Sequence, residues 1–120
     1  MSYTKTDLAE HVLRKLRVID AGEAQADISA ELLSIVTDAY DAKWEEMSAH
    51  GNELTYWPRD TIPNPVLLIL RDLIALEVMD HFGQPISAAN RESEEAVILR
   101  RLRRHTQIKS SGNPAQAMYY

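Results

Sequence analysis

The segment NPVLLILRDLIALEVMDHFG, residues 64–83, predicts a helix that is apolar on nearly every side. Such a helix needs neighbours all round, so we expect it to lie at the centre of the fold. Pro65 suits the first helical turn, where a missing amide hydrogen costs little. Phe82-Gly83 predicts the end of the helix. Its apolar residues are Val66, Leu67, Leu68, Ile69, Leu70, Leu73, Ile74, Leu76 and Met79.

A shorter helix is predicted near the start of the chain, from about Asp7 to Arg17. Thr6 is the expected N-cap, and acidic residues in the first turn favour a helix N-terminus. Ala21-Gly22 predicts its end. Its apolar face comprises Leu8, Val12, Leu13 and Leu16.

An amphipathic helix is predicted between these two. It starts at Asp27 or Ser29 and ends at His50-Gly51, where glycine can take the left-handed conformation. Apolar residues recur at helical spacing, namely Ile28, Leu32, Ile35, Val36, Ala39, Tyr40, Trp44 and Met47. The opposite, polar face is predicted to hold Glu31, Asp38, Asp41, Lys43, Glu45 and Glu46.

A fourth helix is predicted from near Ser87 to about His105, and no periodicity follows Thr106. The connection from Gly51 to Pro65 contains two aromatic residues and, counting Pro65, three prolines, so we expect it to pack in an ordered way over the helices. Its residues 54–57 could be extended, but the sequence offers no evident partner for a sheet. The fold class is therefore all-α: a compact four-helix body, residues 1–106, an aromatic- and proline-containing loop between helices 2 and 3, and an extended C-terminal arm, residues 107–120.

The charge of the chain is divided unevenly along its length. Residues 1–90 carry 7 lysines and arginines against 15 aspartates and glutamates, a net charge of −8, whereas residues 91–120 carry 6 against 3, a net charge of +3. Such polarity favours ordered docking between charged surfaces. The absence of cysteine excludes disulfides and thiolate metal sites and suits a reducing cytosol. The first residues lack the apolar core of a signal peptide, and no apolar run approaches a membrane span.

No arrangement typical of catalysis or of a cofactor is found in the sequence. His11, His50, His81 and His105 are scattered, and none pairs with another at ligand spacing. Adjacent glutamates occur at residues 45–46 and 94–95, as a hydrolase would need, but consecutive helical residues diverge, so we interpret both pairs as solvated. Phosphate-binding glycine loops, nucleophile elbows and zinc-protease motifs are absent. We therefore expect no enzyme activity, no metal and no cofactor.

The densest signal is an arginine-rich segment near the end of the fourth helix, composed of Arg100, Arg101, Arg103 and Arg104 and followed by Lys109. Cations near a helix C-terminus complement the helix dipole, but four arginines exceed what the dipole needs. One interpretation is contact with a partner, either an acidic protein or a nucleic acid. The other is a solvated helix end.

The predicted arm, from Ile108 to Tyr120, ends in Met118, Tyr119 and Tyr120, residue types that often anchor interfaces. Ordering about 14 residues costs on the order of 14–28 kcal/mol in backbone entropy, and burying three such side chains returns roughly 5–9 kcal/mol. We therefore expect the arm to become ordered on a partner, for example by adding to a sheet edge. A frayed terminus is the alternative.

The order of these features resembles the head-to-tail adaptor proteins of tailed bacteriophages, the head-completion or packaged-DNA-stabilisation type. Tyr3-Thr4-Lys5 precedes a short helix, and an amphipathic helix with Tyr40 and Trp44 is followed by Gly51 and an apolar-aromatic loop through Leu54 and Trp57. An apolar helix then starts at a proline and contains Leu73-Ile74-Ala75-Leu76 and Phe82-Gly83. A basic helix comes last, before a tail with proline and tyrosine.

The resemblance implies a structural protein of the virion, made in the host cytoplasm and placed at the head-tail junction. Members of the family form a homo-oligomeric ring, commonly of twelve subunits, that joins the portal protein to the tail or nozzle protein. DNA passes through the ring without sequence-specific contact, and no membrane is involved. The portal- or partner-binding residues would be those of the arginine-rich segment, Ile108, Lys109 and residues 118–120. The alternative function is a small nucleic-acid-binding packaging or regulatory protein that uses the arginines.

Overall fold

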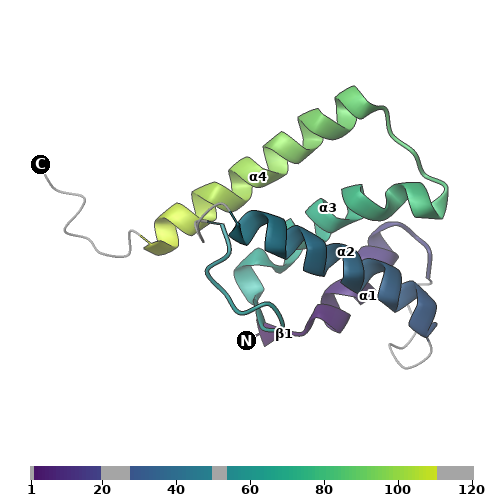
Figure 1. Ribbon diagram of the computed structural model, residues 1–120, viewed down its shortest axis with the longest axis horizontal. Helices are drawn as coiled ribbons and strands as arrows, with labels where there is room; N and C mark the ends of the chain where they lie inside the picture. Colours follow the sequence, from purple (N-terminus) through teal and green to yellow (C-terminus); the bar gives the residue numbers. More distant parts are fainter. Residues whose placement is uncertain (1, 20–27, 50–53, 111–120) are drawn as a thin grey trace, which may run out of the picture.

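The fold was obtained as a computed structural model that describes residues 2–19, 28–49 and 54–110, and of residues 106–110 the backbone alone. The described residues form four α-helices, one short 3-10 helix and one pair of two-residue strands. This confirms the predicted all-α body. Helices α1, α2 and α4 all contact α3, which supplies more buried side chains than any other element described (Figure 1).

Helix α1 spans Lys5–Lys15, so it begins two residues before the predicted start. The prediction of Thr6 as N-cap was wrong, because Thr4 caps the helix in a reciprocal arrangement with Asp7. The Asp7 amide donates to the Thr4 hydroxyl at 3.2 Å, and the Thr4 amide donates to the Asp7 carboxylate at 3.0 Å. This capping box satisfies two amides that would otherwise lack partners.

The end of α1 also differs from the prediction. The chain turns at Arg17, whose φ of 60° lies in the left-handed region. The Val18 amide donates to the carbonyl of Leu13 and the Arg17 amide to that of Arg14, the pattern of a Schellman motif. The helix therefore stops before Ala21-Gly22, a pair that lies outside the described residues.

Helix α2 spans Ala30–Ser48, and of the two predicted starts, Asp27 and Ser29, Ser29 is the N-cap. The Ser29 hydroxyl accepts hydrogen bonds from the amides of Glu31 and Leu32. The buried side chains of α2 are Val36, Tyr40, Lys43 and Met47. The predicted terminator, His50-Gly51, lies outside the described residues.

Helix α3 spans Asn64–Val78 and continues as the 3-10 helix η2, Met79–Phe82. Gly83 follows with a φ of 71°, so the predicted end at Phe82-Gly83 is confirmed. Nine side chains of α3 are buried, as a central helix requires. Leu68 is the exception among its large apolar residues, with 49% of its surface exposed.

A short strand pair and an aromatic contact tie the loop before α3 to the body. Strand β2, Ile62–Pro63, pairs antiparallel with β1, Ser2–Tyr3, a pair that was not predicted. Residues 54–57, which the sequence analysis considered as an extended segment, form no strand. Trp57 is buried, and its indole N–H donates to the Tyr40 hydroxyl at 3.1 Å. That hydroxyl donates in turn to the carbonyl of Arg59 at 2.7 Å.

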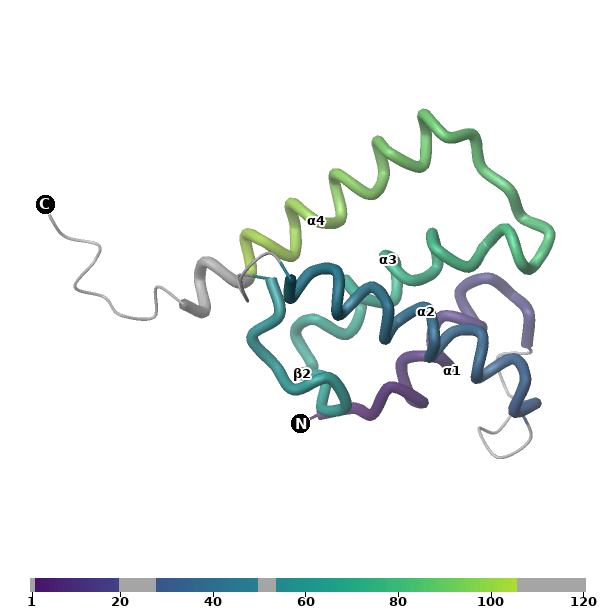
Figure 2. Tube along the Cα trace, in the orientation of Figure 1, coloured from purple at the N-terminus to yellow at the C-terminus, as the bar shows by residue number. Residues whose placement is uncertain are grey.

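Helix α4 spans Ala88–Ser110, five residues beyond the predicted end at His105. The first residues assigned to the arm, including Ile108 and Lys109, therefore continue the helix. Figure 2 shows the trace of α4 crossing one side of the molecule, and in Figure 1 its C-terminal end extends past α2 and α3. Residues 111–120, the rest of the predicted arm, lie outside the described residues.

Candidate interaction surfaces

Helix α4 is attached to the body through a narrow apolar contact. Ile98 and Leu102, four residues apart and so on one face, are buried in the common core. Leu99 packs partly against the same core, while Val97 on the next face is 49% exposed. Most of the helix surface therefore remains available for other contacts.

Polar contacts between α4, α2 and α3 centre on Lys43, whose side chain is only 7% exposed. Its ammonium group lies 2.5 Å from the Glu95 carboxylate on α4 and 3.1 Å from that of Glu77 on α3. Glu46 approaches at 3.4 Å from the same helix. Arg91 extends the network by an ion pair of 2.7 Å with Glu77. We call Lys43, Glu77, Glu95 and Arg91 the inter-helix charge cluster.

The environment of Lys43 keeps it charged. Burial alone would lower the pKa of this ammonium group, but the hydrogen bonds to Glu95 and Glu77, together with their negative charges, raise the pKa above its usual value. A charged lysine is buried here because two carboxylates compensate it.

Two predictions about these residues were wrong. Lys43 does not lie on the solvated face of α2, and Glu95 is not a purely solvated residue, because burial and the ion pair bring them together. The spacing of Val36, Tyr40, Lys43 and Met47 carries the missed signal, since it follows one helical stripe. A single lysine on an apolar stripe predicts a buried, compensated charge.

A second charged cluster lies where α1, α3 and α4 meet. The Asp72 carboxylate accepts contacts from Lys15 at 3.2 Å, from Arg71 at 3.0 Å and from Arg101 at 3.2 Å. Burial alone would raise the pKa of Asp72, but the hydrogen bonds from these three cations outweigh it and hold the pKa below its usual value. Asp72 therefore fixes one of the four arginines of the arginine-rich segment, Arg101, to the body.

The other three arginines of this segment, Arg100, Arg103 and Arg104, are exposed. No ion pair to any of them is found within the part of the chain that the structure describes. We call these three residues the arginine strip. Of the other predicted partner-binding residues, Ile108 and Lys109 belong to the last turns of α4, where the backbone alone is described, and Met118, Tyr119 and Tyr120 lie outside the described residues.

A groove with an apolar floor runs between α1, α3 and α4, with a volume of about 340 Å³. Its rim carries Lys15 and Asp72 on one side and Ser93 and Glu94 on the other. The apolar lining consists of Leu16, Ala75, Leu76, Met79, Val97 and Ile98. The groove is mostly hydrocarbon, which suits packing more than chemistry.

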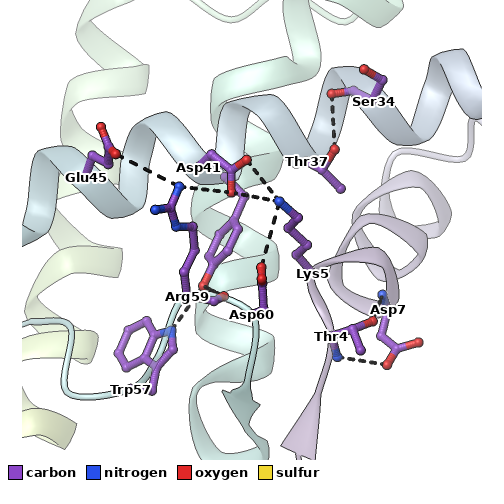
Figure 3. A network of polar contacts seen from close by, with 11 residues as sticks. Thr4, Lys5, Asp7, Ser34, Thr37, Asp41, Glu45, Trp57, Arg59 and Asp60 are labelled. Carbon is purple, nitrogen blue, oxygen red and sulfur yellow. Dashed lines mark hydrogen bonds and ion pairs between the residues drawn. The ribbon is translucent and has the colours of Figure 1, made fainter.

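The exposed side of α2 presents acids at seven-residue intervals, namely Glu31, Asp38 and Glu45, which we call the acidic stripe. Seven residues are about two turns, so the three lie on one face. Figure 3 shows the neighbouring ion pairs: Lys5 lies 3.1 Å from Asp41, and Arg59 lies 3.9 Å from Glu45. Glu31 and Asp38 have no ion pair with a cation in the described ranges.

The described residues contain no cluster of three or more histidines, aspartates or glutamates able to hold a metal ion. None of the helices in the described part of the chain is long and apolar enough to cross a membrane. Comparison with known proteins finds no match: no protein family, no curated protein and no solved structure is significantly similar to the chain. The functional interpretation therefore rests on the two charged surfaces and on the sequence pattern.

Proposed function

We propose that the protein is a structural adaptor of a phage virion, forming a ring that joins the portal to the tail around the DNA exit channel and helps to retain packaged DNA. The observation that carries this proposal is the arginine strip. Three exposed arginines near the C-terminal end of α4 stand directly before the segment that would reach the portal. The ordered resemblance of the sequence to head-to-tail adaptors supplies the identity of the partner.

The net charge of −8 over residues 1–90 supports the same function. An acidic surface around a channel repels the DNA backbone, so DNA would slide without sticking. The basic end of α4 would then contact protein and not the passing DNA.

The direct test adds the purified protein to DNA-filled heads of the encoding phage that lack their tails. Negative-stain electron microscopy is expected to show a ring at the portal vertex and retention of DNA. Deleting residues 111–120 should abolish attachment and leave the melting temperature unchanged, and this deletion keeps α4 whole, unlike one that starts at Ile108. Absence of a ring with the full-length chain would refute the proposal.

The arginine strip also supports a second candidate function, a small nucleic-acid-binding protein. The two functions differ in their response to salt. A phosphate-binding strip of three arginines would bind duplex DNA with an affinity that falls steeply between about 50 and 200 mM salt. We expect the adaptor to show no such binding in a fluorescence anisotropy titration, and tight, salt-sensitive binding would favour the second function.

A further inference from the structure

We infer that the acidic stripe of α2 in one copy docks against the arginine strip of α4 in the next copy. This inference rests on the proposed ring and names the surfaces that build it. Among the side chains that the structure describes, the acidic stripe and the arginine strip are the two largest groups of exposed like charges at regular spacing on single helices, and they have opposite signs. No ion pair joins them within one copy, over the described residues.

Each surface attracts an oppositely charged partner, and a second copy supplies both. Duplex DNA would neutralise the arginine strip but would repel the acidic stripe. A foreign basic protein would do the reverse. Contact between copies pairs both surfaces at once, which is why a second copy of this chain is the favoured occupant.

The shapes of the two helices allow close approach. Small, exposed residues alternate with the acids along α2, at Ser34, Ala42 and the C-cap Ala49. On α4, Ser93 and Ala96 are exposed on the turns before the arginine strip. Small side chains between charged ones let two helices lie side by side while the longer side chains meet across the contact.

The contact joins two different surfaces, so it is heterologous and repeats from copy to copy. A heterologous contact produces a ring if its rotation closes and a filament if it does not. The rigid attachment of α4 through the inter-helix charge cluster fixes the angle between the two surfaces, as a closed ring requires.

Charge reversal tests the pairing directly. Variant A carries Arg100→Glu with Arg104→Glu, and variant B carries Asp38→Lys with Glu45→Lys. Each variant alone places like charges across the contact, and we expect its self-association, measured by sedimentation velocity at low salt, to weaken by at least ~100-fold. The control Asp80→Lys with Glu94→Lys changes the net charge as much as variant B, but Asp80 lies on η2 and Glu94 about 120° around α4 from Arg100, so the control should associate like wild type.

Mixing variants A and B is the decisive step. The reversed α4 of A then meets the reversed α2 of B, and the native α4 of B meets the native α2 of A. An equimolar mixture should therefore recover association to within about threefold of wild type, since both contacts again join opposite charges. Failure of the mixture to recover would overturn the inference.

The cysteine-free chain permits an independent test by disulfide trapping. Two single-cysteine variants, Asp38→Cys and Arg104→Cys, should form a disulfide-linked dimer when mixed under oxidising conditions. The matched mixture of Asp38→Cys with Asp80→Cys, whose second cysteine lies on η2 and off the contact, should give little dimer. Equal yields from the two mixtures would overturn the proposed contact.

The outcomes also separate this inference from the proposed function. If the wild-type protein associates with itself and the reversals have no effect, the ring stands and the α2–α4 contact is overturned. If the wild-type protein remains single at high concentration and also fails to assemble on phage heads, both are overturned.

Discussion

Replacing Lys43 by methionine tests whether the inter-helix charge cluster holds α4 in place. Methionine has a similar length and keeps the apolar contacts, so the change removes mainly the charge. Breaking a fully buried ion pair costs about 3–5 kcal/mol. The partners are only partly buried, with Glu77 26% and Glu95 28% exposed, and Glu77 keeps Arg91. Screening by solvent therefore reduces the expected loss to about 2–3 kcal/mol.

Urea denaturation followed by circular dichroism measures the loss of unfolding free energy. For a chain of 120 residues, 1 kcal/mol corresponds to roughly 4 °C, so the melting temperature should fall by about 8–12 °C. Lys5→Met is the matched control, because Lys5 also forms ion pairs but its side chain is 35% exposed. This substitution should lower the free energy of unfolding by under ~1 kcal/mol. If Lys43→Met costs no more than this control, the cluster does not stabilise the fold.

Adding Glu95→Gln to each background gives a test of sign. In wild type, Glu95→Gln removes a partner of Lys43 and should destabilise the protein. In the Lys43→Met background the same change removes an uncompensated carboxylate and should stabilise it. Destabilisation in both backgrounds would contradict the assignment of Lys43 and Glu95 as an energetically coupled pair.

Three further predictions follow from the other charged and strained groups. Burial raises the pKa of Tyr40 to about 12, so the free energy of unfolding should fall by about 2–3 kcal/mol as pH rises from 10 to 12. An alkaline titration of tyrosine absorbance at 295 nm should show a late ionisation step that is missing in Tyr40→Phe. Arg17→Gly should raise the free energy of unfolding by about 0.5–1 kcal/mol, because glycine adopts the left-handed conformation without strain. The melting temperature should rise by about 2–4 °C, whereas Arg17→Ala should give no such rise. Asp72→Asn should lower the free energy of unfolding by about 1–2 kcal/mol at pH 7, measured by urea titration. Because the pKa of Asp72 is lowered in the folded state, the difference in unfolding free energy between wild type and Asp72→Asn should shrink as pH falls below 3.8.

The helices could be predicted from the sequence because their apolar periodicity and their terminators agree. Val66 to Met79 is apolar all round, and α3 is the central helix. Ser29 and Gly83 mark ends that depend on the local chain alone, and both were found. The end of α1 was missed because Arg17 takes a conformation that its residue type disfavours, and a tertiary fold can impose such a conformation.

The charge clusters could not be assembled from the sequence because their members come from different helices. Glu77 and Glu95 lie 18 residues apart, and Lys43 lies further away still, so only the packing of α2, α3 and α4 brings them together. The apolar spacing of Val36, Tyr40 and Met47 could have placed Lys43 in the core. It could not have identified the carboxylates that pair with Lys43. The arginine-rich segment could be recognised, but no local pattern distinguishes Arg101, which pairs with Asp72, from the other three arginines.

The polar contacts of α4 explain how a helix with few buried residues can hold its arginines in a defined position. Burying Ile98 and Leu102 supplies roughly 3–6 kcal/mol and fixes which face of α4 meets the body. Two residues on one face do not fix the register, since a shift of one turn would bring other side chains to the same place. Arg91, Glu95 and Arg101 have partners on α2 and α3 along nearly three turns, and such a shift would leave these charges unpaired. Charge pairing therefore sets the register of α4, and with it the position of the arginine strip relative to the acidic stripe. A contact that repeats from copy to copy requires this relative position to be the same in every copy.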